Sequence, residues 1–302
     1  MNRFKEIELE SLQDSWVIMY TFIARELLEK GGFEGERVLR EAVRRYGRDR
    51  GLSNRRRLLE NNVKINLATL FSEGRDRPGE PRFTAKVLRG TREERISDTL
   101  ICSFADVWKK YDAKHLGRIY CEEFHIASYQ AFGFGKTKVN LSRTLTQDGD
   151  DRCCFYHTYR PENLTDEERR LSFEEYDEGY VKPDREMPKP EGKSGFRALW
   201  IKMYFHFLET AAERWGEDDA RSLVGSGLRA AAVEQARVFA EIARSTERVV
   251  DEGFLEGHHP LSLGPSPGDE TLPEACCALG AQSLLFENYC LTIRKELGLD
   301  AA

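Results

Sequence analysis

A segment that contains short strand-like stretches, residues 82–159, lies between two long stretches in which apolar residues recur at intervals of three and four. Such intervals predict amphipathic helices, whereas alternation bounded by turn residues predicts strands. The 302 residues are enough for one large domain or two ordinary ones. We therefore expect an α+β protein, with helices packed on a four-stranded antiparallel sheet, followed by a C-terminal helical extension.

The N-terminal stretch predicts three helices. The first covers residues 7–30 and stops at Gly31-Gly32, and the second runs from about Glu34 to Tyr46. Ser53 is a suitable N-cap for a third helix that extends to about Phe71. Arginines are concentrated here (Arg40, Arg44, Arg45, Arg48, Arg50, Arg55, Arg56 and Arg57). They either cover a solvated helix surface or neutralise an anionic substrate or partner.

The central segment predicts strands at residues 82–88, 95–101, 138–146 and 152–159, with helices at 103–111 and 117–131. Residues 147–151 join the last two strands. They contain Asp148-Gly149, a dipeptide typical of hairpin turns. We expect these two strands to form an antiparallel hairpin.

The remaining residues divide at a polar segment. Residues 160–193 contain four prolines and an acidic stretch, which is typical of a connector on the surface. Helices are expected at 196–214, 217–252 and 272–297, the second broken near Gly225 or Gly227. The expected domains are therefore 1–160, carrying the sheet, and 194–302, which is helical, with a linker at 161–193.

Composition excludes several classes of protein. The formal net charge is −6, with 32% charged residues, which argues against a general nucleic-acid binder. No stretch approaches the roughly 20 apolar residues of a membrane span, and the charged start is unlike a signal peptide. We expect a cytoplasmic protein that binds neither nucleic acid nor membrane. Its seven cysteines are expected to be free thiols.

Residues 102–159 carry a recognisable pattern. It consists of a helix led by Cys102, a helix start at Tyr120-Cys121 with Phe124, the strand pair Arg143-Thr144, and a closing Gly-Asp-x-x-Cys-x-Phe at residues 149–155. This pattern resembles the L-2-amino-thiazoline-4-carboxylic acid hydrolase family. His125 stands where many relatives are expected to have aspartate. The closing motif also resembles small-ligand-binding domains of the 4-vinyl reductase type, which are often sensors.

Cys121 and His125 are the principal catalytic candidates. Residues four apart share one face of a helix, and an imidazole beside a cysteine promotes the thiolate. A position near the start of the helix after Gly117 would favour the thiolate further. Cys121 could then attack an sp2 carbon directly, or Glu122 or Glu123 could activate water, with His125 as the acid. The alternative is that Cys121 is a buried apolar residue and His125 a satisfied polar one.

Arg143 is the principal candidate for binding a substrate carboxylate, because a guanidinium can grip a carboxylate through two hydrogen bonds. An ion pair with Asp150 or Asp151 is the competing interpretation. We include Asn140, Asp150 and Tyr120 as further substrate-binding candidates. Cys121, His125 and Arg143 are expected to line one pocket.

A metal site is the chemical alternative, because Cys102, Cys121, His125 and Cys153 form a soft ligand set suited to zinc. None of their spacings is that of a zinc knuckle, so we expect neither a metal nor a cofactor. The sequence also has no Walker loop, no G-x-S-x-G and no H-E-x-x-H.

The resemblance implies a hydrolase of a small, anionic, nitrogen- or sulfur-containing compound, such as a cyclic amidine or a thiazoline. The reaction would open a ring or cleave a C–N or C–S bond. A non-catalytic small-ligand sensor and a helical homodimerisation module are the alternatives. The expected partners are a small-molecule substrate and a second copy of the chain in a homo-oligomer.

Overall fold

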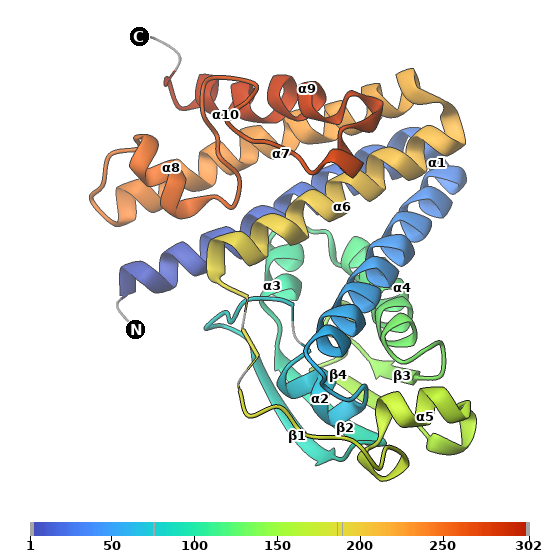
Figure 1. Ribbon diagram of the computed structural model, residues 1–302. Helices are drawn as coiled ribbons and strands as arrows, with labels where there is room; N and C mark the ends of the chain where they lie inside the picture. Colours follow the sequence, from blue (N-terminus) through green and yellow to red (C-terminus); the bar gives the residue numbers. More distant parts are fainter. Residues whose placement is uncertain (1–2, 75, 186, 189, 300–302) are drawn as a thin grey trace. The chain divides into compact units, whose positions relative to one another are not determined.

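The computed structural model describes residues 3–74, 76–185, 187–188 and 190–299. Within them, helices accompany one four-stranded antiparallel sheet, and a helical part follows towards the C-terminus (Figure 1). The α+β fold class expected from the sequence is confirmed.

The chain forms two compact units. Unit 1 comprises residues 1–42, 79–81 and 192–302, and unit 2 comprises residues 43–78 and 82–191. The long helix α1 (Arg3–Glu60) contributes residues to both. The expected domains, 1–160 and 194–302 with a linker at 161–193, stay a prediction about which parts fold on their own.

Unit 2 contains the sheet, whose strands lie in the order β1-β2-β4-β3. In chain order its elements are β1 (Thr84–Gly90), β2 (Glu94–Ile101), α3 (Ser103–Lys110), α4 (Lys114–Phe132), β3 (Lys138–Arg143) and β4 (Cys153–Thr158). β3 and β4 form the expected antiparallel hairpin. Gly149 in its turn has a φ of 88°, a conformation that costs glycine little. The Asp148-Gly149 hairpin is therefore confirmed.

The sheet has two different faces. Along β4, Cys153, Phe155 and His157 project to one side, and Cys154 and Tyr156 to the other. His157 is 1% exposed and Tyr156 is 40% exposed. We call the buried side, which α4 covers, the inner face and the other the outer face. A residue paired directly with one of these shares its face.

The glycines of helix α1 adopt two kinds of backbone conformation. At Gly32 the backbone leaves the helical region, with φ 53° and ψ −130°, close to where we expected the first helix to end. Gly47 and Gly51 stay helical. A Cβ at Gly47 would lie 2.9 Å from the carbonyl oxygen of Phe124, and one at Gly51 would lie 2.2 Å from that of Ser128. These two glycines therefore let α1 and α4 approach closely.

The expected third helix, from Ser53 to Phe71, is wrong. Ser53 lies inside α1, which continues to Glu60. A separate helix, α2 (Leu67–Ser72), begins after Asn66, whose side chain accepts a hydrogen bond from the Thr69 N–H in a capping box. Gly47 and Gly51, which precede Ser53, serve helix packing and do not end α1.

The segment after β4 is more than a surface connector. It contains 3-10 turns at Pro161–Asn163 and Glu174–Tyr176 and the helix α5 (Asp166–Ser172). Phe173 and Leu164 are buried in a core that includes Leu58, Ile65 and Tyr159. The acidic residues that suggested a solvated linker flank these apolar anchors.

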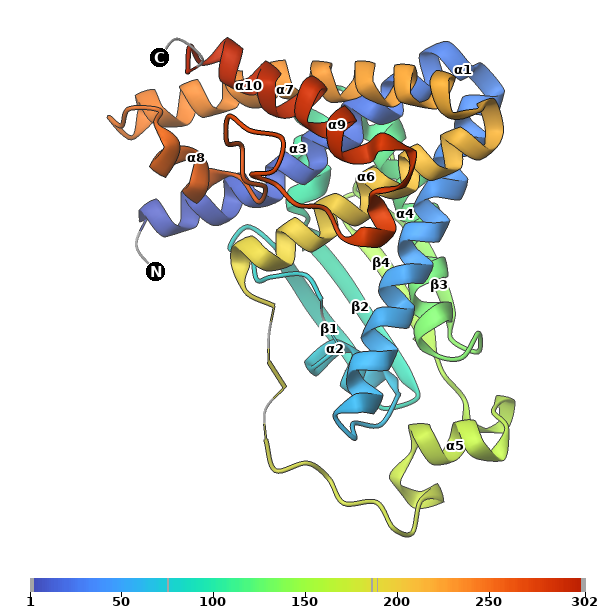
Figure 2. The same cartoon turned by 45° about the horizontal axis from the view of Figure 1, so that its top comes forward.

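Unit 1 is helical. Its elements after α1 are α6 (Gly192–Trp215), α7 (Glu217–Ser245), α8 (Glu252–His258), 3-10 turns at Glu274–Cys276 and Ala278–Gly280, α9 (Ala281–Leu285), a π-helix at Phe286–Cys290, and α10 (Leu291–Glu296). Helices α9 and α10 lie along α7 (Figure 2).

The expected break in α7 is wrong, because α7 is continuous through Gly225 and Gly227. A Cβ at Gly227 would lie 2.6 Å from the Cα of Ile23, and one at Gly225 would lie 3.1 Å from Leu284 Cδ1. The absence of a side chain at both glycines therefore lets a neighbouring helix pack closely against α7.

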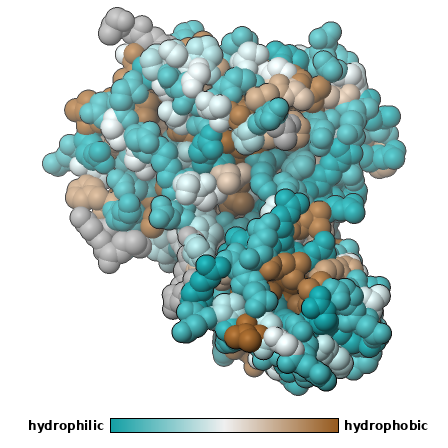
Figure 3. Space-filling view, in the orientation of Figure 1, coloured by the Kyte–Doolittle hydropathy of each residue, from teal (hydrophilic) through white to brown (hydrophobic). Residues whose placement is uncertain are grey.

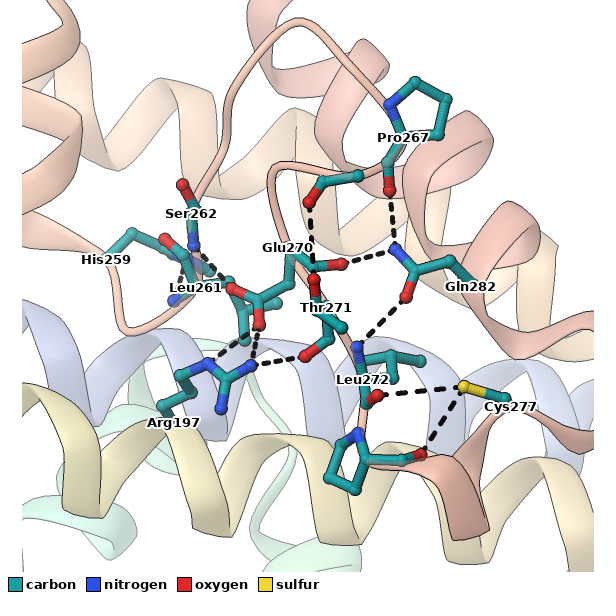
Figure 4. A network of polar contacts seen from close by, with 12 residues as sticks. Arg197, His259, Leu261, Ser262, Pro267, Glu270, Thr271, Leu272, Cys277 and Gln282 are labelled. Atoms are coloured by element: carbon teal, nitrogen blue, oxygen red, sulfur yellow. Dashed lines mark hydrogen bonds and ion pairs between the residues drawn. The ribbon is translucent and has the colours of Figure 1, made fainter.

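A polar network holds the loop between α8 and α9 (Figure 4). The Glu270 carboxylate, whose side chain is 5% exposed, accepts hydrogen bonds from Arg197 Nε and the Ser262 N–H, both at 2.7 Å. Gln282 accepts from the Leu272 N–H at 3.1 Å. The buried carboxylate is thus satisfied within the protein, as a structural ion pair requires.

Hydrophilic residues cover most of the face seen in Figure 3, and hydrophobic residues form small patches on it. No helix in the described part of the chain is long and apolar enough to cross a membrane.

Candidate functional site

Helix α4 directs Cys121 and His125 towards the inner face of the sheet. The ring of His125 lies 4.8 Å from that of Phe155 on β4. Cys121, one turn earlier, lies beside Thr146 and the thiols of Cys102 and Cys153. The spacing of four thus brings both candidates to one side of the helix, as expected. No hydrogen bond joins these two described residues.

The Cys121 thiol is buried and free. Burial, reinforced by the two neighbouring thiols, raises its pKa well above the ordinary value. The expected help from the helix start is absent, because α4 begins at Lys114, about two turns before Cys121, and the effect of a helix end fades within one turn. Near neutral pH this thiol is therefore protonated.

A second histidine, His157, projects from β4 on the same inner face and is buried, whereas His125 is partly exposed. Burial, with smaller contributions from the charges of His157 and Arg50, lowers the pKa of His125 to about 3. Burial also lowers the pKa of His157 to about 4, although the backbone of Arg95 favours its protonated form. Both imidazoles are therefore neutral at pH 7.

The nitrogens of this pair have unused hydrogen-bonding capacity. His125 Nδ1 and both ring nitrogens of His157 are buried, and none meets a partner at hydrogen-bond geometry. Buried polar atoms are normally satisfied, and exceptions are found at sites that receive water or a ligand.

Aromatic rings enclose the two imidazoles. Tyr129 lies 4.7 Å from His157 between ring centroids, Phe71 lies 5.3 Å from it, and Phe155 stacks on it at 5.6 Å. We call these residues the imidazole cluster: Phe71, Arg95, His125, Tyr129, Phe155 and His157. All except His157 are partly exposed. The cluster is therefore in contact with solvent at its rim.

A buried ion pair supports α4 from the side of α1. Arg50, whose side chain is 9% exposed, donates to the two carboxylate oxygens of Asp76 at 2.7 and 2.5 Å. Its guanidinium lies 4.7 Å from the centre of the Phe124 ring. Burial alone would lower the pKa of Arg50, but Asp76 outweighs it, so the pKa is raised. Arg50 therefore does not cover a solvated helix surface, and its charge is already neutralised by Asp76 within the protein.

Tyr120 belongs to the same packing layer. Its ring stacks on Phe124 at 4.8 Å and lies 5.6 Å from Trp108. Burial raises the pKa of its hydroxyl well above the ordinary value. The structure thus places Tyr120 among aromatic rings next to the buried ion pair.

The two glutamates are engaged in ion pairs. Glu122 pairs with Arg118 at 2.7 Å, and Glu123 pairs with Arg44 of α1 at 2.6 Å. Each carboxylate is thus held by an arginine. Neither contact involves Cys121.

The outer face holds two of the candidates for substrate binding, Arg143 and Asn140. Arg143 pairs with Cys154 in the sheet and Asn140 with Tyr156, so both project outward. Arg143 Nη1 lies 3.7 Å from Asp151, as the competing interpretation expected. Asp150 accepts a hydrogen bond from the Thr144 N–H at 2.9 Å. The structure therefore does not bring Arg143 into one pocket with Cys121 and His125, because alternation along the strands sends it to the other side.

The family comparison covers the segment that carries this site. The model of the family described as L-2-amino-thiazoline-4-carboxylic acid hydrolase matches residues 15–157. Residues 15–157 are therefore similar to this family. The match includes α3, α4 and the strands of the hairpin, and it ends at His157. No curated protein and no solved structure matches the chain.

Within the family segment the zinc alternative is not supported. Among the described residues, no three or more His, Cys, Asp or Glu side chains are grouped so that they could hold a metal ion. Cys102, Cys121, His125 and Cys153 are all described, so they do not form such a group.

The sequence interpretation missed His157, Arg95 and the pair Arg50–Asp76. Alternation at positions 153, 155 and 157 was a usable signal for His157, because it places the imidazole on the same face as two residues of the family pattern. Asp76 lies in a segment rich in Gly, Pro and Arg, and nothing in its neighbourhood indicated a buried partner.

Proposed function

We propose that this chain is a hydrolase of a small nitrogen- or sulfur-containing anionic compound, of the cyclic amidine or thiazoline type, acting at the imidazole cluster. The observation that carries the proposal is the pair of neutral imidazoles with buried, unused ring nitrogens inside the segment that matches the family model. A neutral imidazole can accept a proton, which is what the activation of water requires.

In the proposed reaction His125 or His157 accepts a proton from water while the water oxygen bonds to the sp2 carbon between the two heteroatoms, and the electron pair of the C=N π bond moves to the nitrogen. That nitrogen takes up the proton from the imidazolium. The hydroxyl of the resulting tetrahedral adduct then gives its proton to the imidazole as the C=O bond forms and the C–N or C–S ring bond breaks, and the departing nitrogen or sulfur keeps the electron pair and takes up that proton. The low pKa values make these imidazoles weak bases alone. An anionic substrate nearby would raise both pKa values and strengthen them as bases.

We assign Cys121 a supporting role in this proposal. A thiol with a raised pKa is a poor nucleophile, because the thiolate is the reactive form. Direct attack by Cys121 and activation of water by Glu122 or Glu123 are the less favoured routes.

A ligand sensor is the second candidate. It is favoured by the aromatic character of the imidazole cluster, since rings such as Phe71, Tyr129 and Phe155 bind a flat ligand without any chemistry. It differs from the first proposal only in the absence of turnover.

The decisive experiment follows hydrolysis of 2-amino-2-thiazoline-4-carboxylate in water labelled with 18O. We expect a ring-opened product that carries one labelled oxygen, and no mass adduct on Cys121 after acid quenching. Binding without product would support the sensor. An adduct on Cys121 that forms and decays with turnover would replace the water route by cysteine attack.

A further inference from the structure

The core of unit 1 contains two polar side chains that the protein itself does not satisfy. Trp200 on α6 and Gln235 on α7 are both 0% exposed. Trp200 Nε1 and both polar atoms of the Gln235 amide have no hydrogen-bond partner within the described part of the chain. Burying a polar group without a partner is costly, so such groups usually receive water or a ligand.

The hydroxyl of Tyr289 is a third group with unused capacity. The Leu261 N–H donates to His259 Nδ1 at 3.1 Å, a shorter contact than the 3.4 Å between Nδ1 and the Leu261 carbonyl oxygen. Burial lowers the pKa of His259 to about 3, so the imidazole is neutral and carries its hydrogen on Nε2. Nε2 therefore donates to the Tyr289 oxygen, 3.0 Å away. The hydroxyl proton of Tyr289 is not used in this contact.

These groups gather in one region of the core. The ring centroids of Trp200 and Tyr289 lie 5.2 Å apart, and His259 lies 6.3 Å from Trp200. Gln235 lies one turn before Phe239 on α7, and the Phe239 ring lies 6.1 Å from His259. Tyr289 belongs to the π-helix, a widened turn that is frequent at functional sites.

We propose that the core of unit 1 binds a neutral ligand through an oxygen that accepts hydrogen bonds from the Trp200 indole and the Tyr289 hydroxyl. One such oxygen has two lone pairs and can accept both. The Gln235 amide supplies a further donor and acceptor from α7. Water is the smallest ligand of this kind, and a small amide presents the same oxygen chemistry. The inference concerns unit 1 and does not depend on the function proposed for the imidazole cluster.

The surroundings favour a ligand without charge. Trp200, Gln235 and Tyr289 are uncharged, and Lys193, whose charge reaches His259, is paired with Glu256. A carboxylate in this core would lose its hydration without gaining a counter-charge. We therefore expect an amide to bind in preference to a carboxylate of the same size.

The first test is a crystal structure of the full chain. We expect non-protein density within hydrogen-bond distance of both Trp200 Nε1 and the Tyr289 hydroxyl. A single-atom peak identifies water, and a larger feature identifies an organic ligand whose mass is then read from the denatured protein. Tyr289→Phe should weaken or remove this density. Tyr204→Phe is the matched control, because its buried hydroxyl already donates to the Ala281 carbonyl oxygen at 2.9 Å, and it should leave the density unchanged.

The second test follows the indole N–H signals of the four tryptophans by nuclear magnetic resonance during titration with acetamide or acetate. Trp200→Phe and Trp16→Phe identify the two signals of interest. Trp16 is the control, because its Nε1 donates to the Leu199 carbonyl oxygen at 3.2 Å. Acetamide should shift the Trp200 signal at a concentration at least about tenfold below that of acetate, without shifting the Trp16 signal.

Single-atom density without a response to either probe would retain the site as one that binds water. Three results would overturn the inference: no density together with no response to acetamide, an equal response to acetate and acetamide, or equal loss of density in Tyr289→Phe and Tyr204→Phe. The crystal structure and the titration of the wild-type chain decide the main point even if a variant does not fold.

Discussion

Each unit contains a pair of histidines with buried ring nitrogens, and the two pairs differ in how these nitrogens are satisfied. In unit 1 the Leu261 N–H donates to His259 Nδ1 at 3.1 Å, and Nε2 lies 3.0 Å from the Tyr289 hydroxyl. In unit 2 the buried nitrogens of His125 and His157 have no such partners. The first arrangement is a completed structural contact, whereas the second retains capacity for a ligand.

The pKa values alone do not separate the two pairs. Burial lowers the pKa to about 3 for His259 and His125, and to about 4 for His258 and His157. His258 is an intermediate case, because its Nε2 lies 3.4 Å from Arg248 while its Nδ1 has no partner. A lowered histidine pKa thus reports burial. Ring nitrogens without hydrogen-bond partners indicate which histidine pair is able to bind a ligand.

The largest predicted effect is a loss of catalytic activity that occurs in variants of His125 and His157 and not in variants of the histidine pair of unit 1. His125→Ala and His157→Ala should each lower kcat/KM by about 10²- to 10⁴-fold, as loss of a general base does. His259→Ala should leave kcat/KM of the folded protein unchanged, and so should His115→Ala at an exposed position of α4. Steady-state kinetics would measure this, and an equal loss in His259→Ala would break the comparison.

The next effect concerns the two buried ion pairs. Asp76→Asn should lower the free energy of unfolding by about 3–5 kcal/mol, because it leaves the Arg50 charge buried without a counter-charge. Glu270→Gln should cost less, about 1–3 kcal/mol, since Arg197 is partly exposed. Urea unfolding monitored by circular dichroism gives both values. A larger loss in Glu270→Gln would mean that the ion pair of unit 1 is the more important one.

Acid should weaken the Asp76 ion pair. Arg50 lowers the pKa of Asp76 against the opposing effect of burial, so the pair stabilises the folded state above the ordinary aspartate range. That contribution is lost as pH falls below about 4. Asp76→Asn should therefore reduce the difference between the free energies of unfolding measured in neutral and in acidic solution. An unchanged difference would show that other groups control acid unfolding.

A matched substitution compares a satisfied histidine with an unsatisfied one. His259→Phe should destabilise by about 1–3 kcal/mol, because the Leu261 N–H and the Tyr289 hydroxyl lose their partner. His157→Phe should be neutral within about 1 kcal/mol or stabilising, since it removes unsatisfied polar atoms. The same unfolding assay applies. Equal losses would show that His157 has a structural partner.

The variant His157→Phe should also change how the free energy of unfolding depends on pH. The folded pKa of His157, about 4, lies below the ordinary histidine value, so the unfolded chain takes up the proton first. Stability therefore falls as pH drops below about 6.5, and His157→Phe should make that fall shallower.

The smallest effect concerns Cys121. If its thiol stays protonated and water is the nucleophile, Cys121→Ala should change kcat/KM by less than about tenfold. Cys102→Ala, which removes a neighbouring thiol, is the matched control. A loss beyond about 10³-fold confined to Cys121→Ala would restore the cysteine as nucleophile.

Features fixed by neighbours in the sequence were predictable. The Asp148-Gly149 hairpin and the shared side of Cys121 and His125 follow from a turn dipeptide and a spacing of four. Features that depend on distant partners were not. Gly47 and Gly51 resemble helix breakers until Phe124 and Ser128 of α4 are seen to press against them.

Arg143 shows the same limit for the candidate site. Alternation along β3 predicts that its residues divide between two faces, but it does not tell which face the helices cover. A register shift between Leu141 and Arg143 also interrupts the alternation. His157 was within reach of the same argument, because its alternation with Phe155 and Cys153 is regular.

The pH dependence of kcat/KM tests the central claim most directly, because it reports the groups that titrate in the free enzyme. With neutral His125 and His157 as the functional bases, the profile should be flat from about pH 5 to 9 and fall only in more acidic solution, in keeping with pKa values of about 3 and 4. A rate that climbs through pH 8 to 10, following ionisation of the Cys121 thiol, would contradict the account.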